Sequence, residues 1–185
     1  MRKRTLTIGT IITAVLIIGV VGGVLYVRSP RGQEPGPTTD AELLRRVREM
    51  YADYQRESFP QVKTVTIEEA ERLRREENAL FVDVRSQGEQ AVSMLPGAIT
   101  DVEFLENPKR YTGRPLIGYC TISYRSGVLA RDLREKGIEM MNLRGGMLAW
   151  VHAGNEVYHE GEPIRRVHVY GEEWNLLPAG YEAVW

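Results

Sequence analysis

The sequence is poor in the residue types that most often form cross-links and metal sites. Cys120 is the single cysteine among 185 residues, so no disulfide can form within the chain. Only three histidines are present, and they are scattered along the sequence. A structural zinc site is therefore not expected, and the sequence predicts no bound metal.

A surplus of positive charge is also lacking. The formal net charge is −1, and residues 1–31 hold five basic side chains and no acidic one. The remainder of the chain therefore has 19 basic and 25 acidic side chains, a formal charge of −6. Because no basic face is left to neutralise phosphates, nucleic-acid binding is not expected.

One long apolar run lies near the N-terminus. Residues Thr5–Val27 contain no charged side chain, and as a helix they would span roughly 35 Å, enough to cross a bilayer. We expect an uncleaved membrane anchor over residues 1–28. The alternative is a signal peptide, whose apolar core is shorter and ends in a small-residue cleavage site. The basic residues before the run predict a cytoplasmic N-terminus and an extracytoplasmic domain, periplasmic in a bacterium.

The rest of the chain divides by composition. Residues 29–38 are rich in proline and glycine and predict a flexible linker. Residues 39–61 predict an accessory amphipathic helix, which Thr39 and Glu42 begin with a capping box. Residues 62–157 then alternate short apolar runs with helical patterns and predict the main domain.

This alternation predicts an α/β fold with a central parallel sheet and helices on both faces. Ligand sites in such sheets gather at the carboxyl ends of the strands, and Cys120 follows a strand at such an end. The expected strands are 62–65, 80–84, 116–119 and 138–143, and the expected helices are 66–77, 88–92, 101–106, 126–136 and 147–153.

The stretch around Cys120 joins one of these strands to a helix. Loop amides and the first turn of a helix point unsatisfied N–H groups into one small space, which favours an anion. If the Cys120 sulfur lies at the mouth of that space, its thiolate is stabilised and becomes a better nucleophile at neutral pH. Arg125 adds a planar fork of donors suited to an oxyanion or to the thiolate. The alternative is a small, buried and inert cysteine.

Three ordered motifs resemble those of the rhodanese-type sulfurtransferases, and together they cover about residues 62–157. They are Cys-x4-Arg-Ser-Gly at 120–127, Leu-Phe-Val-Asp-Val-Arg at 80–85 followed by Leu-Pro-Gly-Ala-Ile at 95–99, and Asn-Leu-Arg-Gly-Gly at 142–146. Two positions depart from the family pattern. Ser123 stands where the family often has glycine, and Met94 where it often has histidine.

The resemblance implies a rhodanese-like fold and sulfurtransferase activity. A sulfane sulfur would pass from thiosulfate or a persulfide donor, through a persulfide on Cys120, to a thiol or cyanide acceptor. No organic cofactor and no metal is implied. The expected partners are a small sulfur-containing donor and a thiol acceptor, either a small molecule or a protein.

The resemblance also assigns roles to residues. Cys120 and Arg125 are the expected catalytic residues. Asp83 and Arg85 could be catalytic, but we expect a structural role, bracing neighbouring loops. The residues of the active-site loop expected to bind the substrate are Thr121, Ile122, Ser123, Tyr124 and Ser126.

Two other functions remain open from the sequence. Phosphatases and arsenate reductases of related fold resemble one another in a Cys-x5-Arg loop, whereas four residues separate Cys120 from Arg125 here. A non-enzymatic persulfide carrier or sensing module that docks a membrane partner is the second alternative. Because the loop has no charge besides Arg125, we expect weak thiosulfate affinity and a preference for an organic or protein persulfide.

Residues 158–185 form a C-terminal extension rich in aromatic side chains. Disordered tails are poor in aromatics, so we expect this extension to pack on the domain, where it could also wall the active site.

Overall fold

The computed structural model describes residues 38–185. The predicted anchor, residues 1–28, and nearly all of the predicted linker lie outside the described residues. Within residues 38–185, no helix combines the length and the apolar character that crossing a membrane requires.

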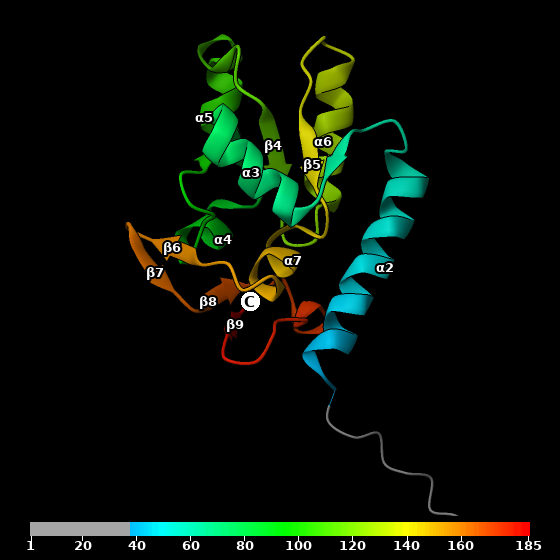
Figure 1. Cartoon of the computed structure of the whole chain (residues 1–185), viewed down its shortest axis with the longest axis vertical. Coiled ribbons are helices and arrows are strands. Elements are labelled where there is room, and N and C mark those ends of the chain that lie inside the picture. The colour runs from blue at the N-terminus through cyan, green and yellow to red at the C-terminus, as the bar shows by residue number, and fades with distance from the viewer. Residues whose placement is uncertain (1–37) are drawn as a thin grey trace, which may run out of the picture. The chain divides into compact units, whose positions relative to one another are not determined.

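The structure confirms the predicted α/β fold with a central parallel sheet (Figure 1). Five parallel strands lie in the order β1-β5-β4-β2-β3, which places β4 at the centre of the sheet. The strands are β1 (Thr64–Val65), β2 (Leu80–Asp83), β3 (Ile99–Thr100), β4 (Leu116–Tyr119) and β5 (Met141–Leu143). The helices are α2 (Asp40–Ser58), α3 (Ile67–Glu77), α4 (Gln87–Val92), α5 (Asp101–Glu106), α6 (Tyr124–Arg134) and α7 (Gly146–His152), with 3-10 turns η1 (Pro108–Tyr111) and η2 (Glu172–Trp174).

Alternating side chains of the central strands point to opposite faces of the sheet, and each face has its own apolar core. Leu80 and Val82 belong to one core, which α5 and α6 cover with Phe104 and Leu133. Phe81 lies between them in the chain and belongs to the other core, which α3 and α7 cover. Both faces are therefore buried, as a parallel sheet requires.

The helix α2 packs along this domain against α6 and α7 (Figure 1). Its two buried residues serve different cores, since Val47 belongs to the core of α3 and α7 and Tyr51 to the core of α5 and α6. The capping box at its start forms as predicted, with Thr39 Oγ1 accepting from the Glu42 N–H.

Several expected element boundaries differ from the structure by one to three residues, and two of these differences have a clear local cause. Helix α6 begins at Tyr124, two residues before the expected start, because Ser123 has left-handed backbone angles (φ 66°, ψ 28°) that turn the chain directly into the helix. Strand β5 begins at Met141 rather than at residue 138, because the Ile138 N–H still closes the end of α6 on the Leu133 carbonyl (3.0 Å).

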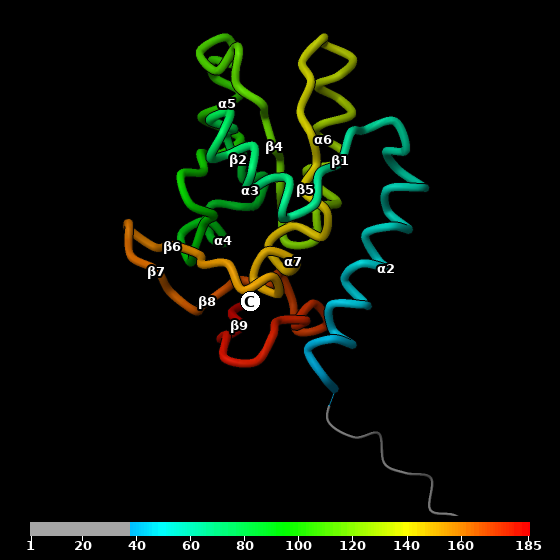
Figure 2. The backbone as a smooth tube through the Cα atoms, in the orientation of Figure 1, coloured from blue at the N-terminus to red at the C-terminus, as the bar shows by residue number. Residues whose placement is uncertain are grey.

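The C-terminal extension packs on the domain. It contains the hairpin β6 (Val157–His159) and β7 (Glu162–Ile164) and the parallel pair β8 (Arg166–His168) and β9 (Glu182–Val184). In Figure 2 this orange and red segment gathers below α4 and α7 and reaches the start of α2. The Ala179 N–H donates to Asp40 Oδ1 (2.9 Å) at that point. The buried apolar side chains of the C-terminal extension join the core of α3 and α7. These side chains are Val167, Val169, Leu176 and Leu177.

Candidate active site

Cys120 lies directly after β4, at the carboxyl end of the central strand. Cys120 is only 2% exposed, yet it lines a pocket of about 330 Å³ that opens to the surface. The cysteine is therefore buried at the base of a pocket rather than sealed within apolar packing, and a small reagent can approach it.

The backbone of the following loop is oriented by the first turn of α7. The carbonyl oxygens of Cys120 and Thr121 accept hydrogen bonds from the N–H groups of Met147 (2.9 Å) and Leu148 (3.1 Å). Among residues 38–185, no acceptor is bonded to the N–H groups of residues 121–125. These donors directly follow Cys120 in the chain, and a run of loop amides without acceptors favours an anion.

Asn142 holds the loop in this shape from the adjacent strand β5. Its side-chain amide donates to the Ser123 carbonyl (2.9 Å), and its side-chain oxygen accepts from Ser126 Oγ (2.7 Å). All three residues are fully buried. Sequence reasoning placed Asn142 in a motif but missed this role, which a polar residue in a short buried strand could have signalled.

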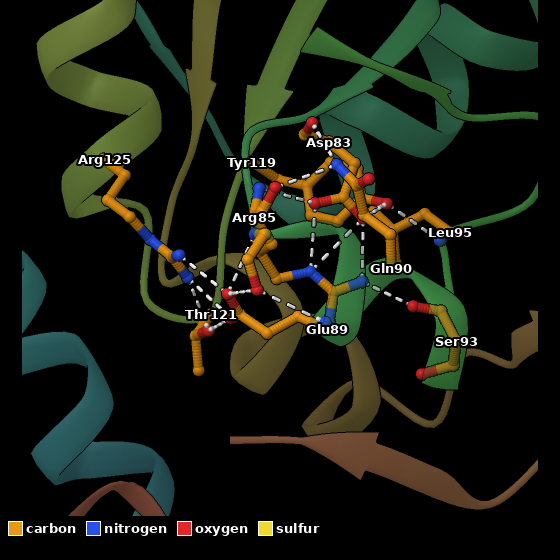
Figure 3. A network of polar contacts seen from close by, with 10 residues as sticks. Asp83, Arg85, Glu89, Gln90, Ser93, Leu95, Tyr119, Thr121 and Arg125 are labelled. Atoms are coloured by element: carbon orange, nitrogen blue, oxygen red, sulfur yellow. Dashed lines mark hydrogen bonds and ion pairs between the residues drawn. The ribbon is translucent and has the colours of Figure 1, made fainter. Parts of the chain in front are cut away.

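Arg125 points toward Glu89 of α4 and forms a bidentate ion pair (Figure 3). Its two terminal nitrogens lie 2.7 and 2.6 Å from the two Glu89 carboxylate oxygens. Thr121 Oγ1 donates to the same carboxylate (3.1 Å). Burial opposes ionisation of Glu89, but hydrogen bonds from Arg125 and Ser86 outweigh it and lower the pKa of Glu89 to about 2.

The same ion pair acts on the arginine. Burial alone would lower the pKa of Arg125, but the hydrogen bonds to Glu89 raise it instead, so the guanidinium stays charged. The positive charge of Arg125 is compensated by a carboxylate that is 1% exposed.

A second buried network lies beneath the loop and contains Asp83 and Arg85 (Figure 3). The guanidinium contacts both Asp83 oxygens, with its Nη2 2.7 Å from Oδ2, and also donates to the Ser93 carbonyl. Tyr119 Oη donates to Asp83 Oδ2 (2.6 Å) and accepts from the Leu95 N–H (3.1 Å). Burial and the nearby Asp83 charge raise the pKa of Tyr119 well above its usual value, so this phenol stays protonated.

Aromatic side chains form the walls of the Cys120 pocket. Tyr124 lies in the first turn of α6, and its ring meets that of Tyr54 from α2 edge-on, with centroids 5.0 Å apart. The C-terminal extension contributes Tyr170 and Trp174. From its aromatic content, the sequence indicated that the extension could wall the active site, but it did not single out these two residues or Tyr54.

The predicted site residues fall into two groups in the structure. Thr121, Ile122 and Tyr124 line the pocket together with the two expected catalytic residues, Cys120 and Arg125. Ser123 and Ser126 are fully buried and do not line it. The Ser126 hydroxyl holds the loop through Asn142, whereas the Ser123 Oγ has no hydrogen-bond partner among the described residues. The ion pair of Asp83 and Arg85 also lies outside the pocket lining. The functional roles of all these residues stay predictions.

The comparisons with known proteins agree with this architecture. Residues 66–153 match the family model of the rhodanese-like domain. A sulfurtransferase of Allochromatium vinosum is 33% identical over 92 residues, which make up 46% of this chain and 83% of that protein. The chain belongs to the rhodanese-like family.

Other similarities cover less of the proteins compared. A tRNA sulfurtransferase of Desulfurococcus amylolyticus is 42% identical over 81 residues, which make up 43% of this chain but only 16% of that protein. The crystal structure of a thiosulfate sulfurtransferase from Pseudomonas aeruginosa is 21% identical, with a TM-score of 0.45, and the match covers 74% of this chain and 26% of that one.

Proposed function

We propose that this protein is a sulfurtransferase that carries a sulfane sulfur as a persulfide on Cys120. The observation that supports this function best is the position of Cys120 at the base of a pocket, beside five loop N–H groups without an acceptor among the described residues. These donors stabilise a negative charge on the outer sulfur of a persulfide, as backbone amides do in an oxyanion hole.

The reaction has two steps. The Cys120 thiolate attacks the outer sulfur of thiosulfate or of an organic persulfide. The sulfur–sulfur bond of the donor breaks, its electron pair leaves with sulfite or with the thiolate of the donor, and a new sulfur–sulfur bond forms on the enzyme. A thiol or cyanide then takes the outer sulfur and returns Cys120 as a thiolate, so ping-pong kinetics follow.

Arg125 contributes to this reaction mainly by shaping the loop. Its terminal nitrogens are engaged by Glu89 and Thr121, and the pair joins α4 to the start of α6. Because the charge of Arg125 is already compensated, the loop amides are the main donors to a bound anion. This arrangement also disfavours a phosphatase, which needs a wider cradle for a tetrahedral dianion.

The N-terminal run, residues Thr5–Val27, supports a location at a membrane. We propose a single-pass protein whose N-terminus is cytoplasmic and whose rhodanese-like domain is extracytoplasmic, with a small sulfur compound as donor and a thiol as acceptor.

Mass spectrometry of the purified full-length chain tests the proposed function. Incubation with thiosulfate or an alkyl persulfide should add one sulfur atom to the chain, and Cys120→Ser should not gain it. Because Cys120 is the only cysteine, no second thiol confuses the result. An unchanged mass with every donor would overturn the proposal.

Turnover assays separate the alternatives. Release of thiocyanate from cyanide indicates an enzyme, and a stable persulfide that neither cyanide nor thiols discharge indicates a carrier. Hydrolysis of p-nitrophenyl phosphate that depends on Cys120 would favour a phosphatase instead.

A further inference from the structure

Four aromatic side chains line the Cys120 pocket, and we call them the aromatic collar: Tyr54, Tyr124, Tyr170 and Trp174. Tyr124 belongs to the active-site loop, but the other three lie outside residues 66–153, the part that matches the family. Two segments of this particular chain, α2 and the C-terminal extension, therefore determine what can reach Cys120.

The collar is held in place by contacts on both sides. On one side, the Tyr54 and Tyr124 rings are 5.0 Å apart, and Phe59 packs behind Tyr124 at 6.3 Å. On the other side, the Tyr170 ring lies over the Arg125 guanidinium, 5.4 Å from its centroid. The walls are therefore flat apolar surfaces in defined positions before any ligand binds.

The charge of the pocket is compensated as well. Of the described residues that line it, only Arg125 is charged, and its partner Glu89 neutralises it from behind. The Tyr170 ring also lies against this guanidinium, whose central carbon is 5.4 Å from the ring centroid. A dianion such as thiosulfate would lose its hydration here and meet no uncompensated positive side chain.

We propose that this pocket selects low-molecular-weight organic sulfur compounds in which the sulfur is attached to an uncharged, flat apolar group, such as an aryl or benzyl persulfide or thiol. Tyr170 and Trp174 determine this specificity by stacking on that group. A volume of about 330 Å³ suits a small molecule, and Cys120 is too deeply buried for a thiol held on a rigid protein surface. The transfer of sulfur to such a compound rests on the proposed function, but its selective binding does not.

Alkylation of Cys120 tests the selectivity without any sulfur transfer. Three reagents share one reactive group, in which the thiolate displaces iodide: iodoacetate is an anion, iodoacetamide is small and neutral, and N-benzyl iodoacetamide is neutral and aromatic. Each rate on the full-length protein is divided by the rate of the same reagent with N-acetylcysteine. We expect this normalised rate to be about tenfold higher for N-benzyl iodoacetamide than for iodoacetamide, which corresponds to the free energy of a good aromatic contact. The normalised rate of iodoacetate should be lower than both.

Variants assign the selectivity to the collar. Trp174→Ala and Tyr170→Asn should each reduce the ratio of the benzyl to the small neutral reagent by at least a factor of three, since each removes one stacking surface. Asparagine is chosen at 170 because that backbone has a positive φ of 76°, which asparagine tolerates. Trp185→Ala is the matched control, because Trp185 is 59% exposed and does not line the pocket.

The outcomes distinguish this inference from the proposed function. A ratio near one in the wild type, or a high ratio that both collar variants leave unchanged, overturns the selectivity even where thiosulfate forms the Cys120 persulfide. Conversely, a high ratio that the variants reduce supports the selectivity even where no donor forms a persulfide. Should Trp174→Ala fail to fold, Tyr170→Asn decides the test, because Tyr170 is 64% exposed.

Discussion

Ser123 is the residue whose local conformation is least favourable in the loop. Its φ of 66° lies in the left-handed region, and its Oγ is buried without a hydrogen-bond partner among the described residues. Ser123→Gly removes both costs but gives the unfolded chain more freedom, so we expect a net stabilisation of about 1 kcal/mol. Urea denaturation followed by circular dichroism measures the change.

Ser93 provides the matched control for this substitution. Its Oγ is also buried and unpartnered within residues 38–185, but its φ of −167° is extended. Ser93→Gly should therefore destabilise the protein. An extended backbone has no strain for glycine to relieve, and glycine loses more conformational entropy on folding than serine does. Stabilisation by both substitutions would show that the hydroxyl, rather than the backbone of Ser123, is responsible.

Glu89 should make stability depend on acid pH. Its pKa in the folded protein is about 2, below the ordinary 4.5, so its contribution is fully present above pH 4.5 and is lost as the pH falls toward 2. The shift corresponds to about 3 kcal/mol as an upper limit. Urea midpoints of the wild type and Glu89→Gln should differ most at pH 6–7 and converge toward pH 2. A constant difference across this range would contradict the assignment.

The same substitution should alter thiosulfate use. Glu89→Gln leaves the positive charge of Arg125 uncompensated beside Cys120, so the KM for thiosulfate should fall by on the order of tenfold, the value of one charge-assisted hydrogen bond. Steady-state thiocyanate formation at a temperature well below unfolding measures it. Glu71→Gln, which makes the same charge change on α3, is the control. An unchanged or higher KM in Glu89→Gln would mean that Arg125 is not available to the donor.

At the scale of elements, the contact between α6 and the end of α2 depends on a glycine. A Cβ at Gly127 would lie 2.5–2.6 Å from three ring atoms of Phe59, which is itself 1% exposed. Gly127→Ala should therefore cost about 1–3 kcal/mol by overpacking. Gly88→Ala in α4 is the control, because its Cβ would meet nothing closer than 4.0 Å and alanine favours a helix by about 1 kcal/mol. Thermal unfolding of both variants decides the comparison.

The sequence predicted the elements whose signals are local. Helix α3 has the capping box of Thr66 and Glu69, and α5 has the bounds that the sequence indicated, with Asn107 as its C-cap before a proline. The buried run 80–84 gave strand β2 almost residue by residue. These signals depend on neighbouring residues, so one sequence carries them completely.

The partners of the site residues could not be predicted in the same way. Arg125 and Glu89 are 36 positions apart, and Asn142 reaches Ser126 across 16. The motifs placed these residues at strand ends, but which side chain meets which depends on the order of the strands in the sheet. For that reason, the sequence led us to expect Arg125 to orient an anionic donor or the Cys120 thiolate, and it gave no sign that the Glu89 carboxylate also pairs with this arginine.

At the scale of the whole described chain, the C-terminal extension is part of the folded domain and not an accessory to it. Val167, Val169, Leu176 and Leu177 are each at most 6% exposed and share a core with Phe81 of the central sheet. Burying one such side chain contributes about 1.5–3 kcal/mol, so the four together approach the whole stability of an ordinary domain, about 5–15 kcal/mol.

A chain that ends at residue 157 should therefore lose cooperative unfolding, seen as a broad urea transition by far-UV circular dichroism. Leu176→Ala tests the same point within an intact chain and should cost about 2–5 kcal/mol, because Leu176 is 1% exposed and leaves a cavity. Trp185→Ala, at an exposed position, should change stability by less than about 0.5 kcal/mol. A truncated chain that unfolds as sharply as the full chain, at the same urea concentration, would show that the extension only covers a core that is stable without it. In that case the extension would serve the pocket alone, through Tyr170 and Trp174.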